Sequence, residues 1–339
     1  MVLSTLLILS SSCSGADSAS EGMAADVTGQ TSAPTTPSSE SPATSPSTSS
    51  TGAPTTQAST TTASPTAQPT ASTTEVVAAP DSGTDPTTRR VDYGTDARQY
   101  GLLTLPGDAV DDAAGGSLPV VVLVHGGFWR NRFFLDLMFP LVDDLAARGY
   151  AVWNLEYRSV GDPGGGYPGT LQDVAAGVDL LAEVDAPLDL DRVAVVGHSA
   201  GGHLVAWLGS RGLLADGEPG SQPEIAPVLV VPQAGVVDLL TAHAAGLGSG
   251  AVADFMGGSP EELAEAYRVA QPVLDERVRL VHGSNDAIVP PSQSQDAADR
   301  VAAVTIVEGA DHFDVIDPAH ESWAVVAEWL DEVLLPSGG

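Results

Sequence analysis

Lysine is absent from this chain of 339 residues, and its 13 basic side chains, all arginine, face 44 acidic ones. The formal net charge at pH 7 is therefore −31. So few cations cannot neutralise many phosphates, which argues against nucleic acid as a partner. A polybasic membrane patch is excluded for the same reason. The lack of lysine also excludes Schiff-base chemistry and a phosphate-binding lysine.

Cysteine is nearly absent, because Cys13 is the only one. A single cysteine excludes an intramolecular disulfide framework and any metal site built from several cysteines. The apolar run over residues 1–9 is too short to span a bilayer, which takes about 20 residues, and is typical of the apolar region of a signal peptide. The small residues before Cys13 resemble the lipobox of bacterial lipoproteins, in which the cysteine is lipidated after cleavage.

These features predict an exported protein held by a lipid at Cys13 on the outer face of the cell membrane. An ordinary signal peptide that happens to contain a cysteine is the alternative, and it would yield a secreted protein. We expect no membrane contact except through a lipid anchor at Cys13.

Apolar side chains are scarce between residues 31 and 74, where 40 of 44 residues are Ser, Thr, Ala or Pro. Such a segment cannot bury enough surface to offset the conformational entropy lost on folding. We therefore predict a signal peptide or lipobox segment over residues 1–13, a disordered linker over 14–88 and a folded domain over 89–339. Seven acids and no arginine precede residue 89, so a charge of −24 belongs to that domain.

From about residue 89 onward, short β-branched apolar runs alternate with longer helical patterns. This alternation predicts an α/β fold with a mostly parallel central sheet flanked by helices. Gly149 follows a helical pattern as a C-terminal cap, and Thr170 with Asp173 suggests a variant capping box at the start of the next helix. The expected strands are 100–105, 119–124, 150–155, 192–196, 228–231, 278–281 and 301–307, and the expected helices are 135–148, 170–183, 204–208 and 323–335.

Residues 197–201 have the sequence Gly-His-Ser-Ala-Gly, which matches G-x-S-x-G between an expected strand and an expected helix. The motif needs this context, because a sharp strand-to-helix turn exposes the serine. Small residues at Gly197 and Gly201 let such a turn close. We therefore predict Ser199 as a catalytic nucleophile.

A serine hydroxyl needs a base that is oriented by an acid. In chain order the acid follows the serine and precedes the histidine in this class of hydrolase. His312 follows the last expected strand and Asp286 follows the one before it, so we predict these two as base and acid. Asp238 is the only topologically sensible substitute acid. The other histidines after the serine are His203, His243, His282 and His320. We interpret His203, His282 and His320 as structural or surface residues.

An oxyanion hole requires backbone N–H groups from the residue after the nucleophile and from a loop after an earlier strand. Ala200 meets the first condition, and the loop His-Gly-Gly-Phe-Trp over residues 125–129 meets the second. We predict Gly127, Phe128 and Ala200 as the donors. The aromatic rings of Phe128 and Trp129 are expected either to line a substrate pocket or to pack in the interior, and the sequence does not separate these roles.

Over about residues 89–335 the chain resembles the α/β-hydrolase superfamily, and within it the branch of kynurenine formamidases (arylformamidases) and bacterial feruloyl and acetylxylan esterases. The matching stretches are 125–129, 156–158, 167–174, 197–203 and 311–315. The resemblance implies the α/β-hydrolase fold and a triad of Ser199, Asp286 and His312. It is specific for fold and mechanism but weak for substrate.

We therefore expect a serine hydrolase that cleaves carboxylic esters through a covalent acyl-enzyme, with no cofactor, no metal and no protein partner. The substrate is expected to be a small-molecule or polymer-linked ester, and a neutral one, because the acidic domain would repel anions. Residues 235–270 are expected to form a cap or excursion over the site. The alternatives are an amidase of arylformamidase or dipeptidyl-peptidase type and, in another class, a catalytically silent cell-surface binding module.

Overall fold

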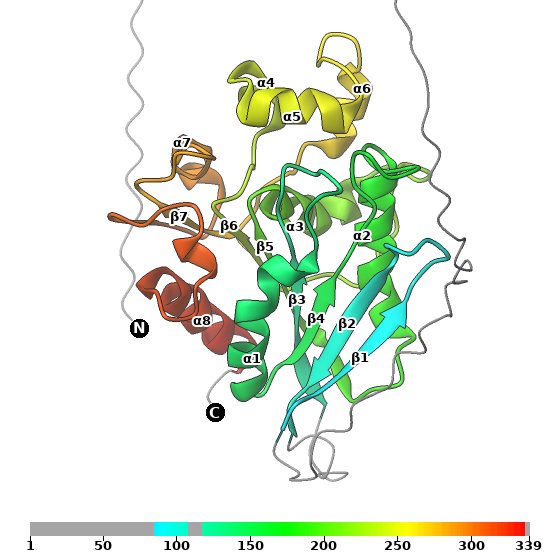
Figure 1. The fold of residues 1–339 in the computed structure, drawn as a ribbon, viewed down its shortest axis with the longest axis vertical. Coiled ribbons are helices and arrows are strands. Elements are labelled where there is room, and N and C mark those ends of the chain that lie inside the picture. Colours follow the sequence, from blue (N-terminus) through cyan, green and yellow to red (C-terminus); the bar gives the residue numbers. More distant parts are fainter. Residues whose placement is uncertain (1–84, 108–116, 336–339) are drawn as a thin grey trace, which may run out of the picture. The chain divides into compact units, whose positions relative to one another are not determined.

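The computed structural model describes residues 85–107 and 117–335. The predictions for the signal peptide, for Cys13 and for nearly all of the linker lie outside the described residues. The described chain forms an eight-stranded sheet with helices on both faces, as Figure 1 shows, so the predicted α/β-hydrolase fold is confirmed.

The sheet has the strand order β1-β2-β4-β3-β5-β6-β7-β8. β1 and β2 run antiparallel to their neighbours, and the pairs from β4 through β8 are parallel. The strands are β1 (Thr87–Asp92), β2 (Tyr100–Leu105), β3 (Leu118–Val124), β4 (Ala151–Leu155), β5 (Leu188–His198), β6 (Leu229–Gln233), β7 (Arg279–Gly283) and β8 (Ala303–Val307).

Two hydrophobic cores fill the space on the two faces of the sheet. Alternate residues of β3 serve opposite cores, with Val120 and Val122 in one and Val121 and Leu123 in the other. Both faces of a parallel strand are covered, which explains why this strand is a continuous apolar run. The first core packs against α2 (Gly169–Asp179) and α3 (Ala200–Ser210), and the second packs against α1 (Phe139–Ala147) and α8 (Glu321–Leu334).

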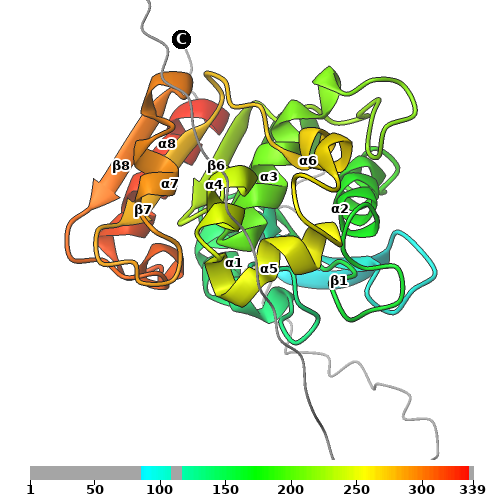
Figure 2. The ribbon, with the colours of Figure 1, turned by 90° about the horizontal axis from the view of Figure 1, so that it is seen from above.

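Three short helices between β6 and β7 form the expected excursion over residues 235–270. They lie beyond the end of the sheet at which β5 passes into α3, as Figures 1 and 2 show from two directions. Their Gly-rich sequence allows positive φ angles at Gly248 and Gly250, which divide the middle helix. They are α4 (Leu239–Ala244), α5 (Leu247–Met256) and α6 (Ala264–Ala270), and α7 (Ser292–Gln295) follows β7.

Some local predictions were wrong in instructive ways. β1 was missed because it is an edge strand with an exposed face and no apolar alternation. For the same reason the predicted linker ends too late, since Thr87 and Thr88 already belong to β1. The predicted capping box of Thr170 and Asp173 does not form, since α2 begins at Gly169, and Thr170 Oγ1 instead donates to the carbonyl of Arg158. The Asp173 carboxylate instead receives two bonds from the Arg158 guanidinium. The prediction for Gly149 is confirmed, because it has φ 91° just after α1.

Candidate active site

Ser199 lies on the sharp turn between β5 and α3. Its backbone has φ 57° and ψ −118°, a conformation that non-glycine residues rarely adopt and that is characteristic of strained functional positions. The turn is held from both sides: the Ser199 amide donates to the carbonyl of Gln233 at 2.9 Å, and the Ser199 carbonyl accepts from the amide of Gly202 at 2.9 Å. The serine is thereby fixed at the N-terminus of α3, where the helix dipole favours negative charge.

Glycines allow the elbow and the loop after β3 to approach each other closely. A Cβ atom on Gly126 would lie 2.8 Å from the Cβ of Ser199 and 2.7 Å from the carbonyl oxygen of His198. A Cβ atom on Gly201 would lie 2.1 Å from the carbonyl oxygen of Val124. Any side chain at these positions would force the Ser199 turn away from the loop.

His312 and Asp286 meet across the ends of β7 and β8. His312 Nδ1 lies 2.6 Å from Asp286 Oδ2, and both side chains are buried. The other carboxylate oxygen accepts from the amides of Ile288 and Val289 at 2.8 and 2.9 Å. Burial alone would raise the pKa of Asp286, but hydrogen bonds from His282 and His312 outweigh it and hold the pKa below its ordinary value. The acid therefore stays ionised.

His282 is a second histidine on the same carboxylate, and sequence reasoning treated it as a structural residue only. Its Nε2 lies 3.2 Å from Asp286 Oδ2 and 3.0 Å from the carbonyl of Val289, and its Nδ1 lies 2.8 Å from Ser294 Oγ. A carbonyl can only accept, so Nε2 carries the proton and Nδ1 accepts from the serine hydroxyl. His282 thus orients the carboxylate that holds His312.

His198, the residue before Ser199, also contacts the segment after β8 that carries His312. This segment is called the histidine loop below. Its Nε2 donates to the carbonyl of His312 at 2.8 Å, and the two rings lie 4.5 Å apart between centroids. Burial, reinforced by the neighbouring His312, lowers the pKa of His198 to about 3, so the ring is neutral. Gln233 makes a parallel link. Its side-chain Nε2 donates to the carbonyl of Val315 at 2.5 Å, and its backbone carbonyl accepts from the Ser199 amide.

The predicted loop after β3 has an unusual backbone. Gly127, Phe128 and Trp129 have φ values of 113°, 56° and 55° in succession. Within the part of the chain that the structure describes, the amides of Gly127, Phe128 and Ala200 donate no hydrogen bond to protein. The loop is tied down instead at its far end, where Val160 donates to the Trp129 carbonyl at 2.7 Å.

Trp129 does not line an open pocket, because its side chain is completely buried in the core. Its ring stacks on Phe255 at 4.9 Å, and its indole N–H donates to His203 Nδ1 at 3.3 Å. His203 in turn donates from Nε2 to the carbonyl of Ala270, and burial lowers its pKa to about 4. Of the two roles left open for Trp129, the structure shows packing.

A buried carboxylate, Glu156, contacts the first residue of the loop after β3, His125. Glu156 is completely buried and accepts from Arg98 at 2.7 Å and from the amide of Leu135 at 2.9 Å, with His125 Nε2 3.3 Å away. Burial alone would raise the pKa of Glu156, but these three partners lower it below the ordinary value. Sequence reasoning noted Glu156 only as part of a family motif. A glutamate directly after an apolar strand was the available signal.

The remaining sequence candidates lie outside this arrangement. The Asp238 carboxylate caps α4 by accepting from the amides of Leu240 and Thr241, so it does not replace Asp286. His320 caps α8 and accepts from the amide of Ser322. His243 packs edge-on against Tyr267.

Residues 85–107 and 117–335 contain neither a metal-binding cluster nor a membrane-spanning helix. No three His, Cys, Asp or Glu side chains gather there in a metal-binding arrangement. None of the helices in that part of the chain combines the length and the apolar character that crossing a bilayer demands.

A mostly parallel sheet with a serine on the β5–α3 elbow and a histidine–aspartate pair beside it defines an α/β-hydrolase. The model of the BD-FAE family matches residues 109–301, and the chain belongs to this family.

Proteins that resemble this chain in sequence or structure include esterases. Esterase LipC of Mycobacterium tuberculosis is 28% identical over 257 residues, which span 68% of this chain and 61% of that relative. Esterase B of Lactobacillus rhamnosis superposes with a TM-score of 0.60 at 25% identity, over 74% of this chain and 84% of its own. An acetyl ester-xyloside bifunctional hydrolase of Caldicellulosiruptor lactoaceticus shares the fold, with a TM-score of 0.57 at 20% identity over 76% and 100% of the two chains.

Proposed function

We propose that this protein is a serine hydrolase that cleaves carboxylic esters through a covalent acyl-enzyme. The observation that carries the proposal is the 2.6 Å contact between His312 and Asp286 beside a serine held on a strained elbow. The BD-FAE family and the similarity to esterases support an ester as the substrate.

Each residue of the triad has one step to perform. With Nδ1 donating to Asp286, the neutral His312 ring carries its lone pair on Nε2. Ser199 Oγ attacks the ester carbonyl while its proton passes to Nε2, and the same proton then leaves with the alcohol as the C–O bond breaks. Water repeats the sequence on the acyl-enzyme and releases the acid. Asp286 stays ionised and stabilises the imidazolium formed in each half-reaction.

The oxyanion of each tetrahedral intermediate would be bound by the amides of Gly127, Phe128 and Ala200. These amides make no hydrogen bond within the described chain and adjoin the N-terminus of α3, which supports the assignment. The positive φ angles of Gly127 and Phe128 are the backbone strain by which such a loop can turn its N–H groups toward a ligand.

The substrate class follows from charge and from the relatives. A domain charge of −24 favours neutral esters over anionic ones. One structural relative is described as an acetyl ester-xyloside hydrolase, so an acyl group on a small molecule or on a polysaccharide is the substrate that we propose.

The decisive test is fluorophosphonate labelling of the native chain, followed by a hydrolysis panel. We expect labelling of Ser199 that disappears in Ser199→Ala, and hydrolysis of short p-nitrophenyl esters, methyl ferulate or acetylated xylan. No labelling of the folded native protein would reject the serine hydrolase and support a silent binding module. Labelling with hydrolysis of N-formylkynurenine or dipeptide amides, but of no ester, would assign an amidase instead.

We further propose that the hydrolase domain is exported and held by a lipid at Cys13, with the segment between Cys13 and β1 as a tether. The single cysteine after an apolar run and the Ser/Thr/Ala/Pro-rich segment support this arrangement. Metabolic labelling with palmitate should depend on Cys13. Equal labelling of Cys13→Ala, or none of either chain, would reject the anchor.

A further inference from the structure

Three consecutive residues at the end of the loop after β3 contact a single helix, α5. The Phe128 ring lies against Gly248, where an added Cβ atom would come within 2.4 Å of Phe128 Cδ1. The Trp129 ring stacks on Phe255, with 4.9 Å between the ring centroids. The third residue, Arg130, is 118 positions from Gly248 in the chain, so only the fold brings the loop and the helix together.

Arg130 adds polar contacts to the same helix. Its Nη2 donates to the carbonyl of Gly248 at 3.1 Å and to Asp254 Oδ2 at 3.0 Å. The guanidinium also lies 5.9 Å from the centre of the Phe128 ring. Gly248 therefore contacts this part of the loop in two ways, since its carbonyl accepts from Arg130 and its missing side chain leaves room for Phe128.

The backbone at the start of α5 makes this close contact possible. Gly248, Ser249 and Gly250 have φ values of 59°, 59° and 86°, so the chain turns through the left-handed region before the helix continues. Gly248 faces Phe128, whereas an added Cβ atom on Gly250 would meet nothing within 4 Å. The two glycines share a left-handed backbone and differ in what they face.

The loop after β3 requires support because its backbone is strained. Phe128 and Trp129 have φ values of 56° and 55°, which non-glycine residues seldom adopt. Such conformations persist only where the surrounding structure enforces them. A backbone hydrogen bond from Val160 holds the Trp129 carbonyl at 2.7 Å. Among the residues that the structure describes, no backbone bond holds the Phe128 amide, so its direction depends on where the Phe128 side chain is held.

We infer that α5 positions the oxyanion hole, with Gly248 and Arg130 as positioning residues that hold the Phe128 amide in place. The inference rests on the proposed serine hydrolase, in which this amide is a donor to the oxyanion. Because the oxyanion forms only after Ser199 attacks, a displaced amide weakens binding of the transition state and leaves binding of the intact ester almost unchanged.

The test compares Gly248→Ala with Gly250→Ala in the full chain. The methyl group of the first must displace the Phe128 ring, whereas the second places an alanine with a similar left-handed backbone in open space. We expect kcat for p-nitrophenyl acetate to fall about 10²-fold in Gly248→Ala, as for a lost oxyanion donor, and to stay within about twofold of the parent in Gly250→Ala. KM should change little in either. Fluorophosphonate labelling to completion counts the competent sites, so that kcat refers to folded chains.

Inhibition by 2,2,2-trifluoroacetophenone isolates the oxyanion. Ser199 Oγ adds to the ketone carbon, the serine proton passes to His312, and the ketone oxygen becomes an oxyanion like that of the tetrahedral intermediate. In Gly248→Ala the inhibition constant should rise by the factor by which kcat/KM falls. A merely structural loss of folded chain would lower the number of competent sites and leave this constant unchanged.

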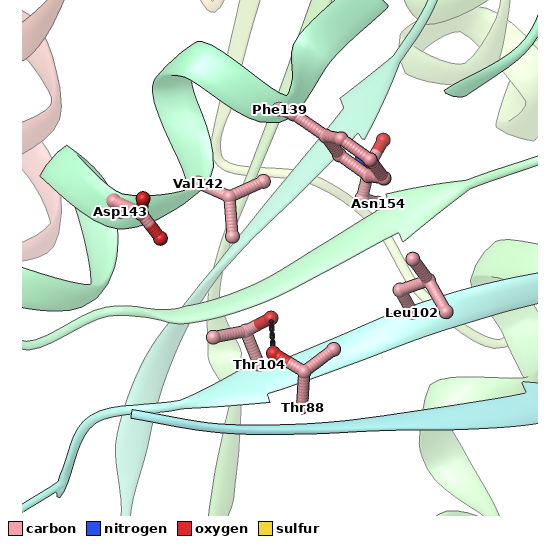
Figure 3. Close-up of a pocket in the computed structure, with 7 residues that line it drawn as sticks. All are labelled: Thr88, Leu102, Thr104, Phe139, Val142, Asp143 and Asn154. Atoms are coloured by element: carbon pink, nitrogen blue, oxygen red, sulfur yellow. Dashed lines mark hydrogen bonds between the residues drawn. The ribbon is translucent and has the colours of Figure 1, made fainter. Parts of the chain in front are cut away.

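A double-mutant cycle tests whether the effect passes through the Phe128 ring. In a Phe128→Ala background the methyl group of Gly248→Ala meets no ring, so it should lower kcat no more than about twofold. Phe139→Ala is the matched background, in which Gly248→Ala should keep its full effect. Figure 3 shows the Phe139 ring in a groove of about 270 Å³ between α1 and the sheet, and none of the residues that line it belongs to the loop or to α5. Arg130→Met removes both polar contacts to α5 and should lower kcat about fivefold.

Three outcomes would overturn the inference. Equal losses in Gly248→Ala and Gly250→Ala would show that strain in the turn, and not the contact with Phe128, lowers kcat. A fall in kcat with an unchanged inhibition constant would place the effect outside the oxyanion hole. A full effect of Gly248→Ala in the Phe128→Ala background would exclude the ring as the link. A folded native chain that neither labels nor hydrolyses the ester would instead reject the proposed function, and this inference with it.

Discussion

His198 Nε2 donates to the backbone carbonyl of His312 at 2.8 Å, so the residue before the proposed nucleophile positions the proposed base. The link joins the end of β5 to the loop after β8, two segments separated by 114 positions in the chain. Because the His198 pKa is about 3, this donor keeps the same protonation state throughout the neutral range.

The first prediction concerns that link. His198→Phe keeps an aromatic ring beside His312 but removes the donor, so the histidine loop loses a buried hydrogen bond. We expect kcat for a short p-nitrophenyl ester to fall about tenfold with KM nearly unchanged, since about 1.4 kcal/mol corresponds to a factor of ten. His198→Gln, which retains an N–H donor, should recover part of the loss. An unchanged kcat in His198→Phe would contradict a positioning role.

The second prediction concerns the close approach at the elbow. In Gly126→Ala the new methyl group would lie 2.8 Å from the Cβ of Ser199, so the loop or the nucleophile must shift. We expect a loss of about 10²-fold in kcat, because catalytic geometry tolerates little displacement. Gly212→Ala is the matched control, since nothing lies within 4 Å of its added Cβ, and it should be as active as the parent. Equal activity of both variants would refute the packing argument.

The third prediction concerns stability and pH. The folded-state pKa of His203 is about 4, against an ordinary value of 6.5, so the unfolded chain binds more protons between these values. The free energy of unfolding therefore decreases as the pH falls from 6.5 toward 4, by up to about 1.4 kcal/mol per pH unit from this residue. Urea denaturation at several pH values measures the slope.

Two variants isolate the His203 contribution. His203→Gln should reduce the slope of stability against pH, because glutamine does not titrate. Val205→Ala changes a buried position on the same helix. It should lower the free energy of unfolding by the same amount at every pH and leave the slope unchanged. A His203→Gln slope identical to that of the parent would contradict the proton linkage.

The fourth prediction concerns the second histidine on Asp286. His282→Phe removes the donor 3.2 Å from Asp286 Oδ2, so the carboxylate keeps only His312 and two backbone amides. We expect kcat to fall about tenfold while KM changes little. Ser294→Ala breaks only the outer bond to His282 and should have a smaller effect. If Ser294→Ala lost as much activity as His282→Phe, the effect would be one of local folding rather than of carboxylate orientation.

Much of the fold could be predicted from the sequence, because the sequence patterns that indicate it are local. Apolar runs such as 119–124 mark strands buried on both faces, and the strand-to-helix context of Ser199 follows from residues beside it. β1 and the limits of α2 were not readable, since an exposed edge strand has no apolar pattern and a helix start depends on what Thr170 and Asp173 contact in the fold.

The amino-acid sequence by itself determined the α/β class, the strained serine turn and the order of serine, acid and histidine along the chain. It did so because glycine spacing and apolar periodicity act over a few residues. Only the tertiary structure decided that His282 and His198 support the histidine–aspartate pair and that Trp129 packs inside. These relationships join residues far apart in the chain, and hydrogen bonding and burial there depend on how the strands align.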